Sequence, residues 1–431
     1  MHLPDHIFLY KVLLALVLAI ANLGLYRWVM AEKANLSHLK WAVLVIFGLK
    51  AAGIIFIYGI YPHFHITSDS NLFYLPYATD ILHGKVPERD FALPYSFFFP
   101  YLLALPVWLW HSAGAICLLM TAIEALMIWR FIRVYDMSPV LKYRTAILYL
   151  STYMSFYFVS FTGYNGIIIC CALVFCLAYQ SPDRQRGWQQ LFFQLGFWLS
   201  KLLMLLYLPV LVFVGKPGIK SLLKRAATLL LIPAFLLVLA LVGIPIAQPI
   251  YEQGYSFTAC NLPFFVWLAF PGLDIQWFTL IDLGILCAAV VLISYYYLRV
   301  SQKHDNYQAI RLCFAAALTL VFLLLSKKAF VQYLEMSYFI MLAALLLLSI
   351  KPFKFILLLN LMNILYPIEL YLEGQITDHQ NESHFKVHGL DSSLLPLILV
   401  DITIMGIYVY LLVSILRFVR PGKMIPINSA P

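Results

Sequence analysis

Residues 61–106 read YPHFHITSDSNLFYLPYATDILHGKVPERDFALPYSFFFPYLLALP and divide two apolar segments. The apolar segments, residues 41–61 and 112–134, each have about the length that crosses a bilayer as a helix. The stretch between them is therefore predicted to be a large loop outside the bilayer. Acids and histidines gather in it: Asp69, Asp80, Glu88 and Asp90, with His63, His65 and His83. If the protein carries out chemistry, this loop is the first candidate site.

The composition is that of a membrane protein. The chain has 431 residues, of which 63% are hydrophobic and 11% charged, whereas an average soluble domain is about 25% charged. Apolar runs of about 17–25 residues recur from end to end. These features predict an all-α polytopic membrane protein. It would form one integral domain over residues 1–431, a bundle of about eleven to thirteen transmembrane helices.

The basic residues do not indicate nucleic-acid binding, although the net charge is +9. Lys and Arg fall mostly in short clusters between apolar runs, as expected for cytoplasmic loops. Membrane lipids are the predicted partners, and nucleic acid is excluded. The seven cysteines lie mostly within apolar runs without metal-ligand spacing, so they are interpreted as core residues.

The basic clusters also predict a topology. Residues 1–40 contain an extra first span, which places the N-terminus outside. The loop 62–111 and a late loop, 373–393, then lie on the outer face. The first loop is predicted to contain an interfacial helix near residues 70–83 and an interfacial or re-entrant segment at 95–110. Residues 188–214 are interrupted by Lys201 and are predicted to form a short hairpin entered from the cytoplasm. Localisation in the plasma membrane with the active site on the outer face follows. Lys50 lies in mid-span and is interpreted as a packing residue.

The residue order in the first loop resembles that of a known family. Asp69 is followed by Tyr74 and Tyr77, then by the segments 78–84, 87–91 and 94–100, which carry Ala-x-x-Ile-Leu-x-Gly, Pro-x-x-Asp-Phe and an aromatic-proline run. This order resembles the first outer loop of GT-C glycosyltransferases, such as the aminoarabinose transferases and the polyprenol-dependent mannosyltransferases. Residues 188–209 resemble a hairpin of that family. The segment KAFVQY, 328–333, resembles its late segment near the donor phosphate.

The chain also departs from the family pattern. A span precedes the first loop, and Asp69 is followed by serine where the family often has a second acid. The turn TGYNG, residues 162–166, carries no acid, although several subfamilies keep one there.

The resemblance implies transfer of a sugar from a polyprenyl-phosphate donor to a lipid or glycan acceptor. Such a transfer needs a base for the acceptor hydroxyl and cations for the leaving phosphate. Asp69 is the predicted general base; the alternative is that it only caps the following helix. Lys327 and Lys328 are the one basic pair assigned to the outer face and are predicted to bind the phosphate.

Other polar residues are candidates for substrate binding, each with a structural alternative. Glu88 and Asp90 flank Arg89 and either bind sugar or acceptor, with Asp90 preferred, or form a local ion pair. Lys201 either meets the phosphate or stabilises the hairpin. Turn chemistry alone can explain Tyr164 and Asn165, and Asp80 is interpreted as solvated. The remaining candidates are Tyr74, Gln332 and Tyr333.

A metal site is a secondary hypothesis. His63 and His65 lie close to Asp69 in the sequence, and His379, His384 and His388 share the late outer loop. Together they could bind zinc, but their spacing is irregular. No cofactor is predicted, and a divalent metal stays open.

Two other functions stay open: a transporter or flippase of lipid-linked glycans, and a polymerase of surface polysaccharides. A transporter is expected to carry polar residues deep in many spans and often has internal repeats. The chain shows few deep charges and no clear repeat, which favours an enzyme.

Overall fold

The computed structural model describes residues 5–31, 35–61, 68–178, 186–212, 230–244, 257–270, 275–301, 307–349, 351–377 and 392–420. Within these ranges the regular structure is helical, apart from an isolated bridge between Pro87 and Phe91. The helices of the first half are α1 (Asp5–Met30), α2 (Leu36–Ile55), η1 (Phe56–Ile60), η2 (Ser70–Tyr74), α3 (Leu75–Leu82), α4 (Phe99–Leu109), α5 (Ala113–Val134), α6 (Pro139–Leu150), η3 (Met154–Phe161), α7 (Gly166–Leu177), α8 (Arg186–Trp198), η4 (Leu202–Tyr207) and α9 (Leu208–Val212). Those of the second half are α11 (Leu231–Leu241), α13 (Leu262–Ala269), α14 (Ile275–Ser301), α15 (Tyr307–Leu325), η5 (Val331–Leu334), α16 (Glu335–Leu348), α17 (Phe353–Ile376), η6 (Ser392–Leu394) and α18 (Leu395–Phe418).

The all-α membrane architecture is confirmed. Among the described residues, 8 helices are long and apolar enough to cross a membrane, or 9 if the bent pair η3 and α7 is one span. The eight are α1, α2, α5 and α14 to α18, in three cases extended by a short neighbouring helix: η1 with α2, η5 with α16 and η6 with α18. The chain is therefore an integral multi-pass membrane protein.

The count of crossings is smaller in the described residues than the sequence suggested. The difference lies in three further apolar segments of the sequence that also predict crossings, residues 145–161, 167–179 and 222–246. Residues 145–161 contain the end of α6 and all of η3, and η3 meets the next helix, α7, at an angle of 112°. Residues 222–246 lie partly outside the described ranges, and their described helix, α11, has 11 residues.

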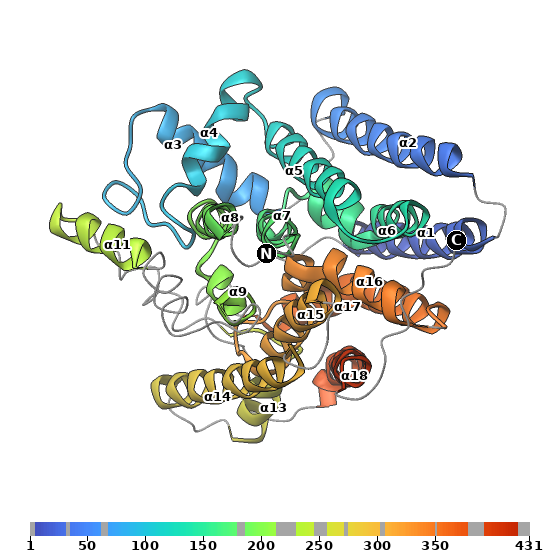
Figure 1. The fold of residues 1–431 in the computed structure, drawn as a ribbon. Coiled ribbons are helices and arrows are strands. Elements are labelled where there is room, and N and C mark those ends of the chain that lie inside the picture. The colour runs from blue at the N-terminus through green and yellow to red at the C-terminus, as the bar shows by residue number, and fades with distance from the viewer. Residues whose placement is uncertain are drawn as a thin grey trace.

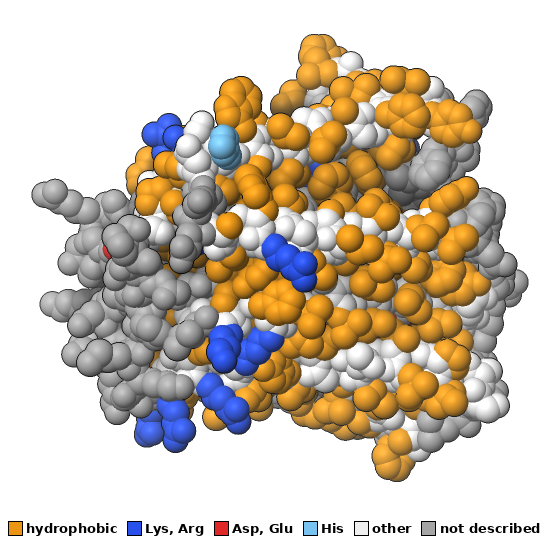
Figure 2. Space-filling model, turned by 90° about the vertical axis from the view of Figure 1, so that its right-hand side faces the viewer, with side chains coloured by type: hydrophobic (Ala, Val, Ile, Leu, Met, Phe, Trp, Pro, Cys, Tyr) orange, Lys and Arg blue, Asp and Glu red, His pale blue; other side chains and the backbone are white. Residues whose placement is uncertain are grey.

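The spans fall into a buried centre and an outer layer. Of the most apolar window in each helix, 94% is buried in α15 and 89% in α16, against 17% in α1, α2 and α14. In Figure 1, α7, α15 and α16 lie in the middle, with α1 and α2 toward one side and α14 toward the other. Figure 2 shows one face, on which hydrophobic side chains cover most of the described surface. Such a surface suits lipid tails.

Local sequence explains where several helices begin. The Ser112 hydroxyl accepts a hydrogen bond from the Gly114 amide and so caps α5. The Asn261 side chain accepts from the Phe264 amide at the start of α13, as N-cap residues do. Pro139 stands at the first position of α6, where its missing amide hydrogen costs nothing.

The segments around the candidate site are short or broken helices. The loop between α2 and α5 contains η2, α3 and α4, which are shorter than the roughly 20 residues a crossing needs. The prediction of helices there is confirmed, while their place at the interface stays a prediction. Helix α8 ends before Lys201, which has extended backbone angles, and η4 follows it. The expected interruption at Lys201 is therefore present.

Candidate functional site

Three segments far apart in the sequence are tied together around the break between α8 and η4. The Ser70 hydroxyl donates to the Thr162 carbonyl at 2.5 Å, which joins η2 to the TGYNG turn. The Ser96 amide donates to the Ser200 carbonyl at 3.1 Å. The Ser200 hydroxyl in turn donates to the Asn165 carbonyl at 3.2 Å. The first loop, the turn and the break thus form one hydrogen-bonded frame.

Gly163 allows the first of these contacts. Its φ is +61°, a left-handed conformation that side chains other than glycine rarely adopt. A Cβ atom at this position would lie 2.4 Å from the Ser70 hydroxyl oxygen. The turn therefore needs glycine here for backbone conformation and for close approach.

Lys201 stands at the centre of this frame, surrounded by aromatic rings. Its ammonium lies 4.9 Å from the ring centre of Tyr95, 5.0 Å from that of Tyr164 and 4.7 Å from that of Tyr333. It also donates a long hydrogen bond of 3.4 Å to the Tyr164 hydroxyl. Burial lowers the pKa of Lys201 to about 8, although Asp69 and Glu335 attract its charge.

Asp69, the predicted base, lies beside this lysine and does not cap η2. It precedes η2, yet its side chain makes no capping hydrogen bond. The Tyr74 hydroxyl donates to its carboxylate over a long 3.5 Å. Burial raises the pKa of Asp69, and the charge of Lys201 and the Tyr74 contact oppose that rise. A carboxyl with a raised pKa is a better proton acceptor than a solvated one.

A pocket of about 290 Å³ opens next to these residues. Of the predicted site residues, Glu88, Lys201, Lys328 and Tyr333 line it. Its remaining wall is largely apolar and aromatic, and includes Tyr95, Phe97, Phe197, Trp198, Leu236, Leu239 and Phe322. The pocket thus combines two cations with an apolar wall.

The two lysines that were expected to act as a pair point to different places. Lys328 lines the pocket. The Lys327 ammonium donates to the Thr279 hydroxyl at 2.6 Å and lies 5.6 Å from the Phe257 ring centre. Lys327 is therefore engaged with neighbouring protein groups, and Lys201 takes its expected place as the second pocket cation.

The acids of the first loop also separate. Asp90 accepts from the Arg89 guanidinium at 2.8 Å and from the Val86 amide at 2.7 Å, and this pairing lowers its pKa to about 2. Asp80 pairs with Lys85 at the surface. Glu88 is buried, adopts a positive φ of 64° and lines the pocket. The structure thus places Glu88, rather than Asp90 with Arg89, at the pocket.

The other candidates lie close by but mostly behind the pocket wall. Tyr74 is fully buried and packs edge-on against Tyr95, with ring centres 5.3 Å apart. The rings of Tyr164 and Tyr333 stack at 6.1 Å. The Asn165 carboxamide is fully buried and has no hydrogen-bond partner among the described residues. Gln332 does not line the pocket.

The zinc hypothesis falls largely on residues that the structure does not describe. His63, His65, His379, His384 and His388 lie outside the described ranges. Among the described residues, no group of three or more His, Cys, Asp or Glu side chains is placed to hold a metal ion.

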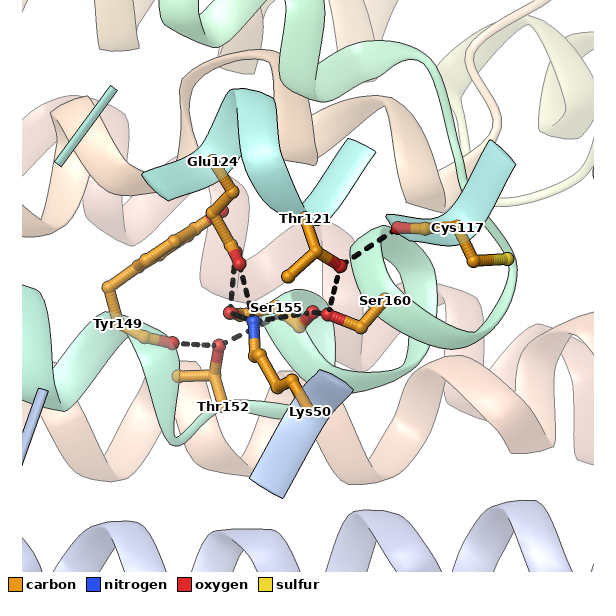
Figure 3. Close-up of polar contacts among 8 residues, drawn as sticks. All are labelled: Lys50, Cys117, Thr121, Glu124, Tyr149, Thr152, Ser155 and Ser160. Atoms are coloured by element: carbon orange, nitrogen blue, oxygen red, sulfur yellow. Dashed lines mark hydrogen bonds and ion pairs between the residues drawn. The ribbon is translucent and has the colours of Figure 1, made fainter. Parts of the chain in front are cut away.

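Lys50, interpreted as a packing residue, forms a buried ion pair instead. Its ammonium lies 2.6 Å from the Glu124 carboxylate, and both side chains are 0% exposed. The Ser155 hydroxyl donates to the same carboxylate at 2.6 Å. Figure 3 shows this pair within a chain of serine and threonine hydroxyls that continues through Thr121 and Ser160. Spacing along the sequence gave no signal that residues 74 positions apart would meet.

Buried acids are more numerous in the spans than the sequence suggested. Glu373 accepts from the Ala259 amide at 2.8 Å, and Asp401 accepts from the Cys260 amide at 3.2 Å. The amide of Thr258, in the same segment, donates to the Lys327 carbonyl at 2.8 Å. Glu373 and Asp401 therefore fix the segment 258–260, which in turn hydrogen-bonds to the loop before η5. Glu335 and Glu369 are buried as well.

Several pocket residues were not predicted. Tyr95 belongs to the aromatic-proline run and Trp198 lies three positions before Lys201, so both lay inside segments already singled out. Leu236 and Phe322 lie in apolar runs, where nothing distinguishes a pocket residue from a lipid-facing one. Comparison of the chain with protein-family models, curated proteins and solved structures finds no match in any of the three.

Proposed function

We propose that the protein is a membrane glycosyltransferase of the GT-C type. It moves a sugar from a polyprenyl-phosphate donor to a lipid or glycan acceptor. The observation that carries this proposal is the pocket, in which Lys201 and Lys328 face an apolar, aromatic wall. A polyprenyl phosphate complements both features, because its phosphate is an anion and its isoprenoid chain is apolar.

In the proposed reaction, Asp69 acts on the acceptor, and the two pocket lysines act on the phosphate of the donor. Asp69 accepts the proton of the acceptor hydroxyl, whose oxygen attacks the anomeric carbon of the sugar. The bond from that carbon to the phosphate oxygen breaks, and the electron pair leaves with the phosphate. Lys201 and Lys328 stabilise the growing negative charge on the phosphate. One carboxylate is enough for such a single displacement with inversion.

The test is transfer by the purified protein in detergent. It is given a polyprenyl-phosphate hexose and candidate acceptors, and wild type is compared with Asp69→Asn. We expect the variant to lose about 100- to 10,000-fold in rate, the usual contribution of a general base. Asp80→Asn is the matched control because Asp80 pairs with Lys85 at the surface. Undiminished transfer by Asp69→Asn would refute the base assignment.

One observation favours transport of a lipid-linked glycan as a second candidate. Ionisable side chains are buried in seven of the described spans: Lys50 in α2, Glu124 in α5, Asp282 in α14, Arg311 in α15, Glu335 in α16, Glu369 in α17 and Asp401 in α18. Intramembrane charges often mark transport pathways. Movement of an intact lipid-linked glycan across proteoliposome membranes, without sugar transfer, would support this function in place of the first.

A further inference from the structure

Lys201 is a pocket cation that no carboxylate holds in an ion pair among the described residues. The ion pairs there are those of Lys50 with Glu124, Lys85 with Asp80 and Arg89 with Asp90. A lysine taken out of water usually needs a partner, because desolvation of an ammonium is costly. Yet its pKa of about 8 leaves Lys201 mostly protonated at neutral pH. Another kind of group must therefore stabilise this charge.

Three tyrosine rings surround the Lys201 ammonium. It lies 4.9 Å from the ring centre of Tyr95, 5.0 Å from that of Tyr164 and 4.7 Å from that of Tyr333. Each distance is within the roughly 6 Å over which an aromatic face attracts a cation. The three rings come from the first loop, the TGYNG turn and η5. Together they form an aromatic cage, which we call the tyrosine cage.

Contacts between these segments keep the rings and the lysine together. The rings of Tyr164 and Tyr333 stack with their centres 6.1 Å apart. The Ser96 amide, next to Tyr95, donates at 3.1 Å to the carbonyl of Ser200, the residue before the lysine. The cage and the lysine backbone therefore belong to one hydrogen-bonded frame, which exists without a bound ligand.

An aromatic ring and a carboxylate stabilise a lysine with different consequences. A carboxylate would cancel the charge of Lys201 and would compete with an incoming phosphate. An aromatic face attracts the cation through its quadrupole but carries no net charge. The cage therefore leaves the site positively charged, as an anionic ligand requires.

We propose that Tyr95, Tyr164 and Tyr333 are positioning residues whose ring faces hold the Lys201 ammonium, in place of a carboxylate, ready for the phosphate of the donor. The inference deepens the proposed function and rests on it for the identity of the anion. The rings act through the lysine, so their hydroxyl groups are not required. This role differs from direct substrate binding, which the sequence predicted for Tyr164 and Tyr333.

The first measurement is the pH dependence of acetylation of each lysine in the full chain in detergent. Trace acetic anhydride reacts with the neutral amine, and mass spectrometry of peptides reads each lysine separately, with the exposed Lys85 as the reference. Lys201 should reach half of its maximal reactivity near pH 8. Tyr95→Leu or Tyr333→Leu, which removes one ring of the cage, should lower this midpoint by about 0.5 to 1.5 pH units, the value of one cation–π contact.

Tyr95→Phe and Tyr333→Phe are the matched controls, because they keep the rings and remove only the hydroxyl groups. Both should leave the Lys201 midpoint in place. Phe97→Leu removes a ring that lines the pocket outside the cage, and it should leave the midpoint in place as well. Leucine and phenylalanine at one position differ only in the ring, so the other charged or titratable groups around Lys201 are constant in each comparison. These groups are Asp69, Tyr74, Glu88, Tyr164, Lys328 and Glu335, with whichever of Tyr95 and Tyr333 is unchanged.

The second measurement is calorimetric binding of farnesyl phosphate at pH 8, with farnesol and inorganic phosphate as probes of the tail alone and the anion alone. The leucine variants should bind about 2- to 15-fold more weakly than wild type, because a smaller fraction of Lys201 is charged. The phenylalanine variants should bind like wild type.

The outcomes separate the cage from the proposed function. Leucine variants with the wild-type midpoint would overturn the inference, even if they bound farnesyl phosphate weakly, because the tyrosines would then contact the ligand themselves. Equal shifts in the leucine and phenylalanine variants would also overturn it, since the hydroxyl groups would be responsible. The expected shifts, without binding of farnesyl phosphate to any form, would uphold the cage and refute the proposed donor. If one leucine variant fails to accumulate, the other decides, because each removes one ring.

Discussion

At the scale of single residues, the protonation of Asp69 should control the acid side of the rate. Burial raises the pKa of Asp69, and a base acts only when deprotonated. As pH falls through this raised pKa, kcat/KM should fall with it, starting above the range of a solvated aspartate. The measurement is the pH profile of transfer.

Asp90 provides the control for this profile. Its pKa is held at about 2 by Arg89 and the Val86 amide, so it stays charged over the whole range of the assay. Asp90→Asn should therefore leave the acid limb where it is. If Asp90→Asn shifted the acid limb of the pH profile, the titrating group would not be Asp69.

Lys327 and Lys328 are adjacent but should behave differently when each is changed to methionine. Lys328→Met removes a pocket cation, so the affinity for farnesyl phosphate should fall about 10- to 100-fold, the value of one charge-assisted contact. Lys327→Met removes a hydrogen bond to Thr279 and should lower the thermal midpoint while changing affinity little. The two variants are compared by calorimetry and thermal unfolding, and equal losses of affinity would count against the separate roles.

At the scale of elements, the TGYNG turn should depend on its first glycine. Gly163→Ala places a methyl group at a positive φ and 2.4 Å from the Ser70 hydroxyl oxygen. We expect a loss of about 1–3 kcal/mol in the free energy of unfolding, the usual cost of such backbone strain. Gly284→Ala in α14 is the control, since no atom lies within 4 Å of its Cβ position. Similar thermal midpoints for the two variants would contradict this account of the turn.

The same elements show what the sequence could predict. The long spans α1, α2, α5 and α14 to α18 followed from apolar runs of bilayer length, because lipid demands such runs whatever their neighbours. The broken helix at Lys201 followed from a charge inside an apolar run. The bend of 112° between η3 and α7 did not, because both pieces are apolar and the turn between them has the ordinary composition of a loop.

The candidate site could be predicted in part for a similar reason. Asp69, Lys201, Lys328 and Tyr333 are polar residues in conspicuous segments, and the structure brings them together. Lys327 and Lys328 are adjacent, and only Lys328 lines the pocket. The conformation of the turn before η5 decides which of the two side chains faces the pocket, and neighbouring residues in the sequence do not reveal that conformation. The sequence did not single out Glu335, because the ionisable groups nearest it come from α2, α5 and the break before η4, all distant in the chain.

At the scale of the whole molecule, the distribution of side chains is the reverse of that in a soluble protein, with large hydrophobic side chains on the surface and ionisable ones between the helices. Large hydrophobic side chains such as Trp41, Trp108 and Trp277 are exposed on the outer helices. Ionisable side chains such as Lys50, Glu124 and Glu335 are buried between helices. Because lipid offers no gain for burying leucine, specific polar pairs are what distinguish one arrangement of spans from another. The ion pair of Lys50 with Glu124 joins α2 to α5 in this way.

This pair should show strong coupling in a double-mutant cycle. Lys50→Met alone leaves Glu124 buried without its cation, and we expect a loss of about 3–5 kcal/mol in the free energy of unfolding. The double variant Lys50→Met with Glu124→Leu removes both charges and should recover most of that loss. The surface pair of Lys85 with Asp80 is the control, and Lys85→Met should cost about 1 kcal/mol or less. Thermal and denaturant unfolding in detergent compare these three variants, and Glu124→Leu alone to complete the cycle, with the wild type. If the double variant were less stable than Lys50→Met, the pair would hold α2 on α5 through its hydroxyl partners rather than through its charges.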